Sequence, residues 1–233
     1  MKILGINYLS ESSVALIEEG KLKYAISEER LNRVKNWWGN PIKAINYVLK
    51  ETNNKIKDID LFATHGSTCF KNFTPTKNIF DKKIKEIQLS KLDSTNKNIQ
   101  INFLKKRFKK ESSARQRNAI NIDTLKKKYK KLDIHDHHEA HAASAYFYSG
   151  WSKCYVLTID GWGDDSSSKL YKANNGKLTQ LSTTSSIDSL GYFYGSITKL
   201  LGYKPHRHEG KVLGLAAFGN YKKAYPYISK MIS

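Results

Sequence analysis

Cysteine is scarce in this chain of 233 residues, which contains only Cys69 and Cys154. Two cysteines so far apart provide neither a disulfide framework nor the ligand spacing of a zinc finger, so we expect a protein of the reducing cytoplasm. Long apolar runs are absent as well: nowhere do about 18 apolar residues follow one another, which argues against a membrane-spanning helix. The N-terminus becomes polar soon after Tyr8, too early for the apolar region of a signal peptide.

Acidic residues are few: 21 Asp and Glu accompany 40 Lys and Arg, for a formal net charge of +19. Residues 71–131 contain 19 of the basic and 5 of the acidic residues, so the other 172 residues, with 21 basic and 16 acidic, are nearly balanced. The charge therefore belongs to one segment, which we interpret as an insert. This segment is either a solvated, partly helical excursion or a surface for phosphates or nucleic acid. Its few aromatic residues disfavour sequence-specific reading of RNA.

Apolar residues, at 39% of the chain with 12% aromatic, suffice for a sizeable core, and their pattern predicts alternating strands and helices. Ser27 is expected to cap a short helix, and Pro41 to precede a second one. Before the basic segment we expect strands at 2–8, 13–18 and 21–26, helices at 28–34 and 42–51, and a strand at 59–63. The apolar stripe of the second helix consists of Ile42, Ile45, Val48 and Leu49.

A second set of elements follows the basic segment. We expect a helix at 138–148, a strand at 154–159, a hairpin of strands 169–172 and 177–182, helices at 189–201 and 210–218, and no element in 222–233. Both sets open with a strand that ends near Asn7 or Asp160, which predicts a duplicated α/β domain with a nucleotide cleft between its halves. The second half is expected to be incomplete. The expected domains are a first α/β half (1–70), the basic, partly helical insert (71–131), and a metal-site helix with a partial second half (132–233).

The densest group of chemically active residues is Asp-His-His-Glu-Ala-His at 136–141. On a helix, His137 and His141 project from one face, with a spacing that suits one divalent ion. The zinc-protease pattern HExxH is absent, because only one residue separates Glu139 from His141. Two imidazoles leave coordination positions open, so we expect a third ligand from elsewhere, a carboxylate, and Lewis-acid chemistry on a carbonyl.

Two further patterns indicate a phosphate or nucleotide site. Asp160 and Gly161 follow a buried strand, where a carboxylate and exposed backbone N–H groups suit a phosphate and its metal, although such a pair is also common in simple turns. Glu209 and Lys211 flank a glycine at the start of a helix. They suit a ribose or phosphate contact, or form an ordinary salt bridge at a helix start.

Several of these residues resemble blocks of a known family. The blocks are 5–7 with 12–16, 28–35, 137–145, 159–161, 189–194 and 209–216, in the family's order. The chain is similar to O-carbamoyltransferases of the nodulation and antibiotic-tailoring type, which are related to the tRNA threonylcarbamoyladenosine transferases. The resemblance implies an actin/sugar-kinase/heat-shock-chaperone ATPase-like (ribonuclease-H-like) α/β fold, incomplete at the C-terminus.

The resemblance also implies an activity. In such enzymes a downstream domain makes carbamoyl adenylate from ATP and carbamoyl phosphate, and the N-terminal domain passes the carbamoyl group to a hydroxyl of a small molecule or sugar. It implies that His137 and His141 bind iron or zinc, with an aspartate beyond this sequence as third ligand and magnesium as a further candidate cofactor. By the same resemblance, Asp160, Gly161 and Gly191 lie at the nucleotide's phosphate, and Glu209 and Lys211 lie along the nucleotide.

The chain departs from the family's pattern in two places. Ser10 and Glu11 replace a His-Asp pair in the first loop, so we predict that Glu11 is the catalytic acid–base residue or holds a metal-bound water. His208 stands where the family often has glycine. Two alternatives remain open: a non-catalytic nucleotide- or RNA-binding module that uses the basic segment, and a tRNA-modifying threonylcarbamoyl transferase.

Overall fold

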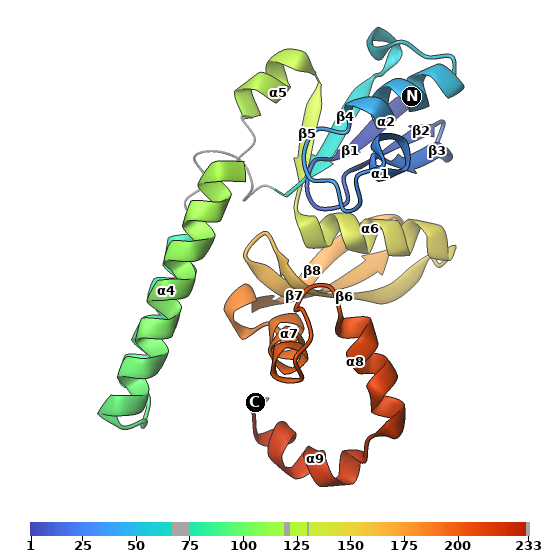
Figure 1. Ribbon diagram of the computed structural model, residues 1–233. Helices are drawn as coiled ribbons and strands as arrows, with labels where there is room; N and C mark the ends of the chain where they lie inside the picture. Colours follow the sequence, from blue (N-terminus) through green and yellow to red (C-terminus); the bar gives the residue numbers. More distant parts are fainter. Residues whose placement is uncertain (67–74, 119–121, 130, 232–233) are drawn as a thin grey trace.

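A computed structural model describes residues 1–66, 75–118, 122–129 and 131–231 (Figure 1); Cys69 lies outside them. The first half is a mixed five-stranded sheet in the order β3-β2-β1-β4-β5. Its strands are β1 Lys2–Asn7, β2 Ser13–Glu18, β3 Lys21–Ser27, β4 Leu61–His65 and β5 Leu132–His135. β1, β2 and β3 run antiparallel, whereas β4 and β5 run parallel to β1. This order and these directions are those of a ribonuclease-H-like sheet, which confirms the expected fold class.

The parallel pairing decides which side chains meet. The carboxyl ends of β1, β4 and β5 lie at one edge of the sheet, so Asn7, His65 and His135 end neighbouring strands there. The core of this half lies between the sheet and helix α2, Ile42–Glu51, and it also includes Leu125 of helix α5, Ile122–Lys128, and Tyr129 directly after that helix. Its fully buried members include Leu4, Leu16 and Val48.

The second half is a three-stranded antiparallel sheet of β6 Lys153–Gly163, β7 Ser166–Asn174 and β8 Lys177–Ser185. Asn175 and Gly176, both with positive φ (46° and 82°), form the turn between β7 and β8, as the hairpin pattern predicted. Helix α6, His137–Ser149, packs on this sheet through Ala142 and Tyr146 (Figure 1). Helix α7, Leu190–Leu200, contacts β6.

The chain continues through α8 Glu209–Leu215 and α9 Tyr221–Ile228, with 3-10 turns at Ala216–Phe218 and Ser229–Met231. We expected no element after 222, so α9 is a correction: Asn220 caps it by accepting the Lys222 N–H, and Pro226 lies inside it. None of the helices within the described ranges combines the length and the apolar character that crossing a bilayer requires.

In the described residues of the basic segment there are three helices, α3 Pro75–Leu89, α4 Ser94–Asn118 and α5 Ile122–Lys128. α3 and α4 pack on each other through Phe80, Ile87 and Leu104. Trp162 of β6 and Ile187, which lies in a 3-10 turn at Ser186–Asp188, pack against the same cluster. The two helices are thus anchored on the second half rather than standing free in solvent.

Other local expectations were wrong. The first helix, α1, is only Glu29–Asn32, and Ser27 does not cap it because Ser27 pairs with Ser13 as the last residue of β3. Ile45, Val48 and Leu49 of the expected stripe are buried, but Ile42 is 55% exposed and Ala44 is buried in its place. The strand expected at 59–63 is β4, which begins and ends two residues later, and β5 was not expected at all.

A buried carboxylate explains how α2 begins. Glu28 is 3% exposed, and its Oε2 accepts the Ala44 backbone N–H at 2.7 Å while Oε1 accepts that of Lys43 at 3.4 Å. These are two of the N–H groups that the first turn of a helix leaves without an intrahelical partner. A side chain from a neighbouring segment therefore caps α2 in place of a local N-cap residue.

Candidate metal and nucleotide site

The first turn of α6 brings two histidines together. Asp136 caps the helix: its Oδ1 accepts the Glu139 N–H at 3.0 Å, and its Oδ2 accepts a hydrogen bond from the Lys169 ammonium at 2.7 Å. Because the helix begins directly after this cap, His137 and His141 lie one turn apart on one face. Their Nε2 atoms are 3.0 Å apart, as the spacing of four residues predicted.

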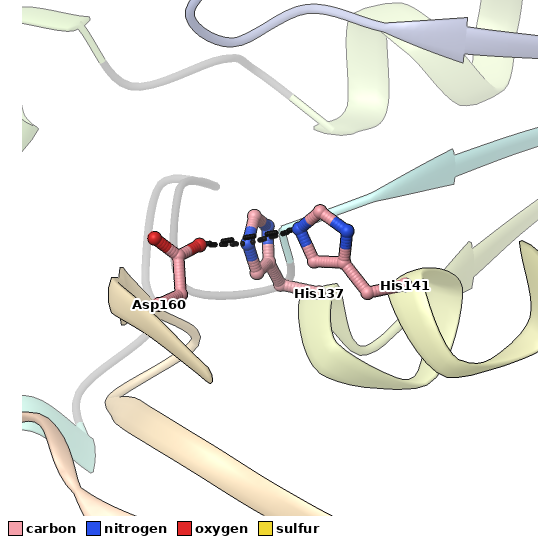
Figure 2. Close-up of side chains that lie close together, drawn as sticks. All are labelled: His137, His141 and Asp160. Atoms are coloured by element: carbon pink, nitrogen blue, oxygen red, sulfur yellow. Dashed lines mark hydrogen bonds and ion pairs between the residues drawn. The ribbon is translucent and has the colours of Figure 1, made fainter. Parts of the chain in front are cut away.

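Asp160 joins these histidines from β6. Its Oδ2 lies 2.8 Å from the His137 Nε2 and 3.9 Å from the His141 Nε2. Figure 2 shows the two imidazoles and the carboxylate directed toward one another, and one atom of each lies within 4.8 Å of the others. Hydrogen bonding from His137, against the opposing effect of burial, lowers the pKa of Asp160. The carboxylate is therefore ionised at neutral pH.

Two imidazoles and one carboxylate fit a divalent ion. This donor set is that of many zinc sites and of non-haem iron sites, and three protein ligands leave positions open for water or substrate. The sequence placed Asp160 beside a phosphate, and the structure adds its contact with both imidazoles. Asp160 could therefore be the third metal ligand, whereas the resemblance implied an aspartate beyond this sequence.

Two glycines allow close packing around this site. A Cβ on Gly163 would lie 2.0 Å from the His137 Cδ2, so no other residue fits behind this imidazole. A Cβ on Gly191 would lie 2.8 Å from the Gly161 Cα, so the start of α7 packs directly on the end of β6. The structure thus brings Gly161 and Gly191, both predicted at the phosphate, together beside Asp160, whose Oδ1 accepts the Gly161 N–H at 2.6 Å.

His65 is a member of the cluster that the sequence patterns did not predict. The Nδ1 atom of His65, at the end of β4, lies 3.3 Å from the His137 Nδ1, and its Nε2 lies 3.1 Å from the Asn7 Oδ1. Burial, followed by the charge of neighbouring His137, lowers the pKa of His65 to about 4, so this ring is neutral at pH 7. The position of His65 at the carboxyl end of a parallel strand could have indicated a site residue. It was overlooked because the strand was expected to end at residue 63.

The remaining histidine of the 136–141 group has a different role. His138 is fully buried, and its Nδ1 and Nε2 contact the Thr158 hydroxyl at 2.9 Å and the Ser166 carbonyl at 3.2 Å. Burial lowers the pKa of His138. Because both nitrogens bond to the second sheet, this histidine anchors α6 there and has no position left for a metal.

Three predicted site residues lie outside the cluster. Glu11 is exposed in the loop after β1, and within the described chain its carboxylate forms no hydrogen bond or ion pair. Glu209 Oε1 accepts the His206 N–H at 2.6 Å. Slight desolvation raises the pKa of Glu209, but this hydrogen bond and others to backbone N–H groups outweigh it and lower the pKa. Glu209 faces α7 at Gly195. Lys211 is exposed on α8, and its ammonium has no partner in the part of the chain that the structure describes.

The basic segment reaches the edge of this site. The guanidinium of Arg107 in α4 lies over the Tyr192 ring, 4.5 Å from its centroid, and over the Trp162 ring, 5.6 Å from its centroid. Its Nη2 donates to the Ser186 carbonyl at 3.3 Å. Trp162 follows Asp160 by two residues on β6, so α4 packs against the strand end that carries the carboxylate.

The fold and the cluster define a mixed α/β protein with a two-histidine, one-carboxylate site at a strand end. Comparison then gives the family: the chain belongs to the carbamoyltransferase N-terminus family, whose model matches residues 2–230. The nodulation protein NolNO of Sinorhizobium fredii is 29% identical over 213 residues, which are 91% of this chain and 28% of that protein. The uncharacterized protein MJ1051 of Methanocaldococcus jannaschii is 31% identical over 221 residues, 93% of this chain and 33% of that protein.

The chain spans about a third of the length of the curated relatives that it matches. Among solved structures, YeaZ from Pseudomonas aeruginosa is similar with a TM-score of 0.40 and 14% identity, over 79% of this chain and 66% of that one.

Proposed function

We propose that this chain performs the transfer step of a carbamoyltransferase, moving a carbamoyl group from carbamoyl adenylate to a hydroxyl of a small-molecule or sugar acceptor. In this reaction the acceptor oxygen bonds to the carbamoyl carbon, and the bond from that carbon to the phosphate oxygen breaks. AMP leaves with the electron pair, and the proton of the hydroxyl passes to a base. The adenylate itself would be made from ATP and carbamoyl phosphate by a further domain or chain.

The observation that carries the proposal is the cluster of His137, His141 and Asp160. These three side chains would hold iron or zinc, since they offer two imidazole nitrogens and an ionised carboxylate within reach of one ion. When bound, such a cation supplies Lewis-acid polarisation of a carbonyl. The exposure of His141 and Asp160, 57% and 40% of their side chains, leaves the site accessible to a substrate.

The remaining roles follow from position and chemistry. Gly161 and Gly191 offer backbone without side chains beside Asp160, where the phosphate of the adenylate would lie. Glu11 would act as the base that accepts the proton of the acceptor hydroxyl, because its carboxylate is exposed and unengaged in the described chain. Glu209 and Lys211, at the start of α8, would line the rest of the nucleotide; magnesium would accompany its phosphate.

Metal binding tests the proposal at its centre. The purified chain is titrated with Zn²⁺ in a calorimeter, together with His137→Ala, His141→Ala and, as a matched control, His135→Ala. His135 is exposed and only two residues before His137. We expect one equivalent of tight binding that both site substitutions abolish and the control retains. Wild-type protein without bound Zn²⁺, or equal loss in the control, would contradict the site.

The transfer step is tested separately. The chain is mixed with carbamoyl adenylate and hydroxylamine, a small general acceptor, and AMP release is measured. We expect metal-dependent release that Glu11→Gln slows at least tenfold, whereas exchange of the neighbouring Ser10 for Ala has little effect. Release that is the same with and without the chain would contradict transfer by this domain.

A second candidate function rests on the exposed lysines of the basic segment. On α3, on α4 and in the loop between them, six lysines are exposed and form no ion pair with described residues: Lys77, Lys82, Lys85, Lys91, Lys105 and Lys106. Several exposed positive charges on one segment suit the phosphates of RNA, by a binding mode that is not specific for sequence and weakens steeply with salt. This candidate predicts that a labelled single-stranded RNA binds at low salt. A fourfold alanine variant at positions 82, 85, 105 and 106 should lose this binding, and Lys172→Ala/Lys177→Ala on the second sheet should retain it.

A further inference from the structure

We infer that His65 and Asn7 are positioning residues that select the form of His137 able to bind a cation. This inference rests on the proposed metal site. His137 uses its two ring nitrogens differently: Nε2 faces Asp160 and His141, and Nδ1 faces His65. Only the form with its proton on Nδ1 presents a lone pair from Nε2 to an ion.

The loop after β1 determines the orientation of the Asn7 side chain. Its Nδ2 donates to the Ser10 carbonyl at 3.1 Å and the Glu11 carbonyl at 3.4 Å. Its Oδ1 accepts the Leu9 N–H at 2.8 Å. The reversed amide would place an NH₂ group against a donor and an oxygen against two carbonyls. Asn7 Oδ1 is therefore an acceptor toward His65.

The acceptor determines the tautomer of His65. Because the Asn7 Oδ1 lies 3.1 Å from the His65 Nε2, that nitrogen carries the proton. The His65 Nδ1 is then a lone pair, directed at the His137 Nδ1 at 3.3 Å. A proton on the His137 Nδ1 satisfies this lone pair, so the His137 Nε2 is the nitrogen that would bind an ion in place of its hydrogen bond to Asp160.

Asp160 makes this selection necessary. Its carboxylate lies 2.8 Å from the His137 Nε2, where it would by itself favour the proton on Nε2 and so close that nitrogen to a cation. The His65 Nδ1 opposes this preference, because it accepts a hydrogen bond from the His137 Nδ1 on the other side of the His137 ring. Second partners of this kind commonly orient metal-binding histidines, and their loss typically weakens metal affinity 10–100-fold.

The same contacts tie the Glu11 loop to the cluster. Asn7 holds the backbone of Ser10 and Glu11 through its amide nitrogen, and the His65 ring through its oxygen. Three hydrogen bonds, which pass through the Asn7 amide and the His65 ring, therefore connect the backbone of Glu11 with His137.

Metal affinity and spectra of the whole chain test the inference. The variants are His65→Phe, which keeps an aromatic ring but removes both nitrogens, and His65→Gln, whose amide can donate to Asn7 and accept from His137. His135→Phe is the matched control. Affinity for Co²⁺ is measured by competition with a chelating indicator, and the visible spectrum of the bound Co²⁺ reports its coordination. The thermal midpoint of each metal-free variant shows whether it is folded.

We expect His65→Phe to weaken Co²⁺ binding 10–100-fold, His65→Gln to restore most of the affinity, and the control to bind as the wild type does. In the Zn²⁺-loaded, ¹⁵N-labelled wild type, the His137 Nδ1 should carry a slowly exchanging proton that His65→Phe loses. Wild-type affinity in a folded His65→Phe variant, or a folded His65→Gln variant as weak as it, would overturn the inference. Absence of Co²⁺ binding in the wild type would instead refute the metal site itself.

Discussion

Gly163→Ala is the most direct perturbation of the proposed metal site. A methyl group at this position would lie 2.0 Å from Cδ2 and 2.5 Å from Cγ of the His137 ring, whereas ordinary contact begins at 3.4 Å. The ring must therefore move by at least about 1.4 Å, several times the roughly 0.2 Å within which metal–ligand distances are held. The backbone of Gly163 does not have positive φ, so alanine is tolerated by the main chain and the effect falls on His137.

Displacing one of three metal ligands should reduce metal affinity more than removing a hydrogen-bond partner of a ligand does. We therefore expect Gly163→Ala to weaken Zn²⁺ binding at least ~100-fold, which corresponds to about 2.8 kcal/mol of binding free energy. Calorimetric titration of the folded protein measures this loss, and urea unfolding of the metal-free protein measures any separate effect on stability.

A second glycine on the same strand provides the control. A Cβ on Gly161 would meet nothing within 4 Å, so Gly161→Ala should leave Zn²⁺ affinity within a few-fold of the wild type, although it lies next to Asp160. Equal affinities of Gly163→Ala and the wild type would show that His137 is not held where the structure places it. Equal losses at both glycines would show that the strand as a whole, rather than this one contact, governs binding.

Three further substitutions test how the site is supported. Glu28→Ala leaves two N–H groups of α2 without an acceptor and should lower the free energy of unfolding by about 1–3 kcal/mol in urea; exposed Glu51→Ala should change it little, and similar losses in both would refute the cap. Arg107→Ala removes a cation held between two aromatic rings, worth about 1–2 kcal/mol, so cleavage of α4 by trypsin should accelerate roughly 5–30-fold. Lys106 is exposed, so trypsin should cleave Lys106→Ala at the wild-type rate. Equal cleavage rates of Arg107→Ala and Lys106→Ala would show that Arg107 does not hold α4 against β6. His138→Leu removes the ring that contacts the Thr158 hydroxyl and the Ser166 carbonyl, and it should cost about 1–3 kcal/mol of stability; an unchanged unfolding midpoint would contradict its anchoring role.

Features that depend on neighbours in sequence were predicted from sequence. The hairpin of β7 and β8 follows from Asn175 and Gly176, because two residues with positive φ match the twist of the strands they join. The approach of His137 to His141 follows from one helical turn and a local cap. The opening strands were also placed within a residue or two of their observed bounds, since alternation of apolar side chains depends only on the local repeat.

Failures of local prediction came where a distant contact overrode a local preference. Ser27 would suit an N-cap, yet pairing with β2 extends β3 through it. The cap of α2 comes from Glu28, 16 residues before the N–H group that it accepts. A pattern of adjacent residues contains no information about such partners, because each depends on how separate segments pack.

Composition and short repeats were enough to predict strands and helices on both sides of a basic segment, and a pair of imidazoles on one helix face. Packing between distant segments brings Asp160 to the two imidazoles as a third donor, and it places His65, 72 residues before His137, against the His137 Nδ1. It also places α4 on the end of β6. His65 lies beside Asn7 because β4 runs parallel to β1 and both strands end at one edge of the first sheet. Asp160 reaches His137 from the antiparallel second sheet, because α6 packs on β6.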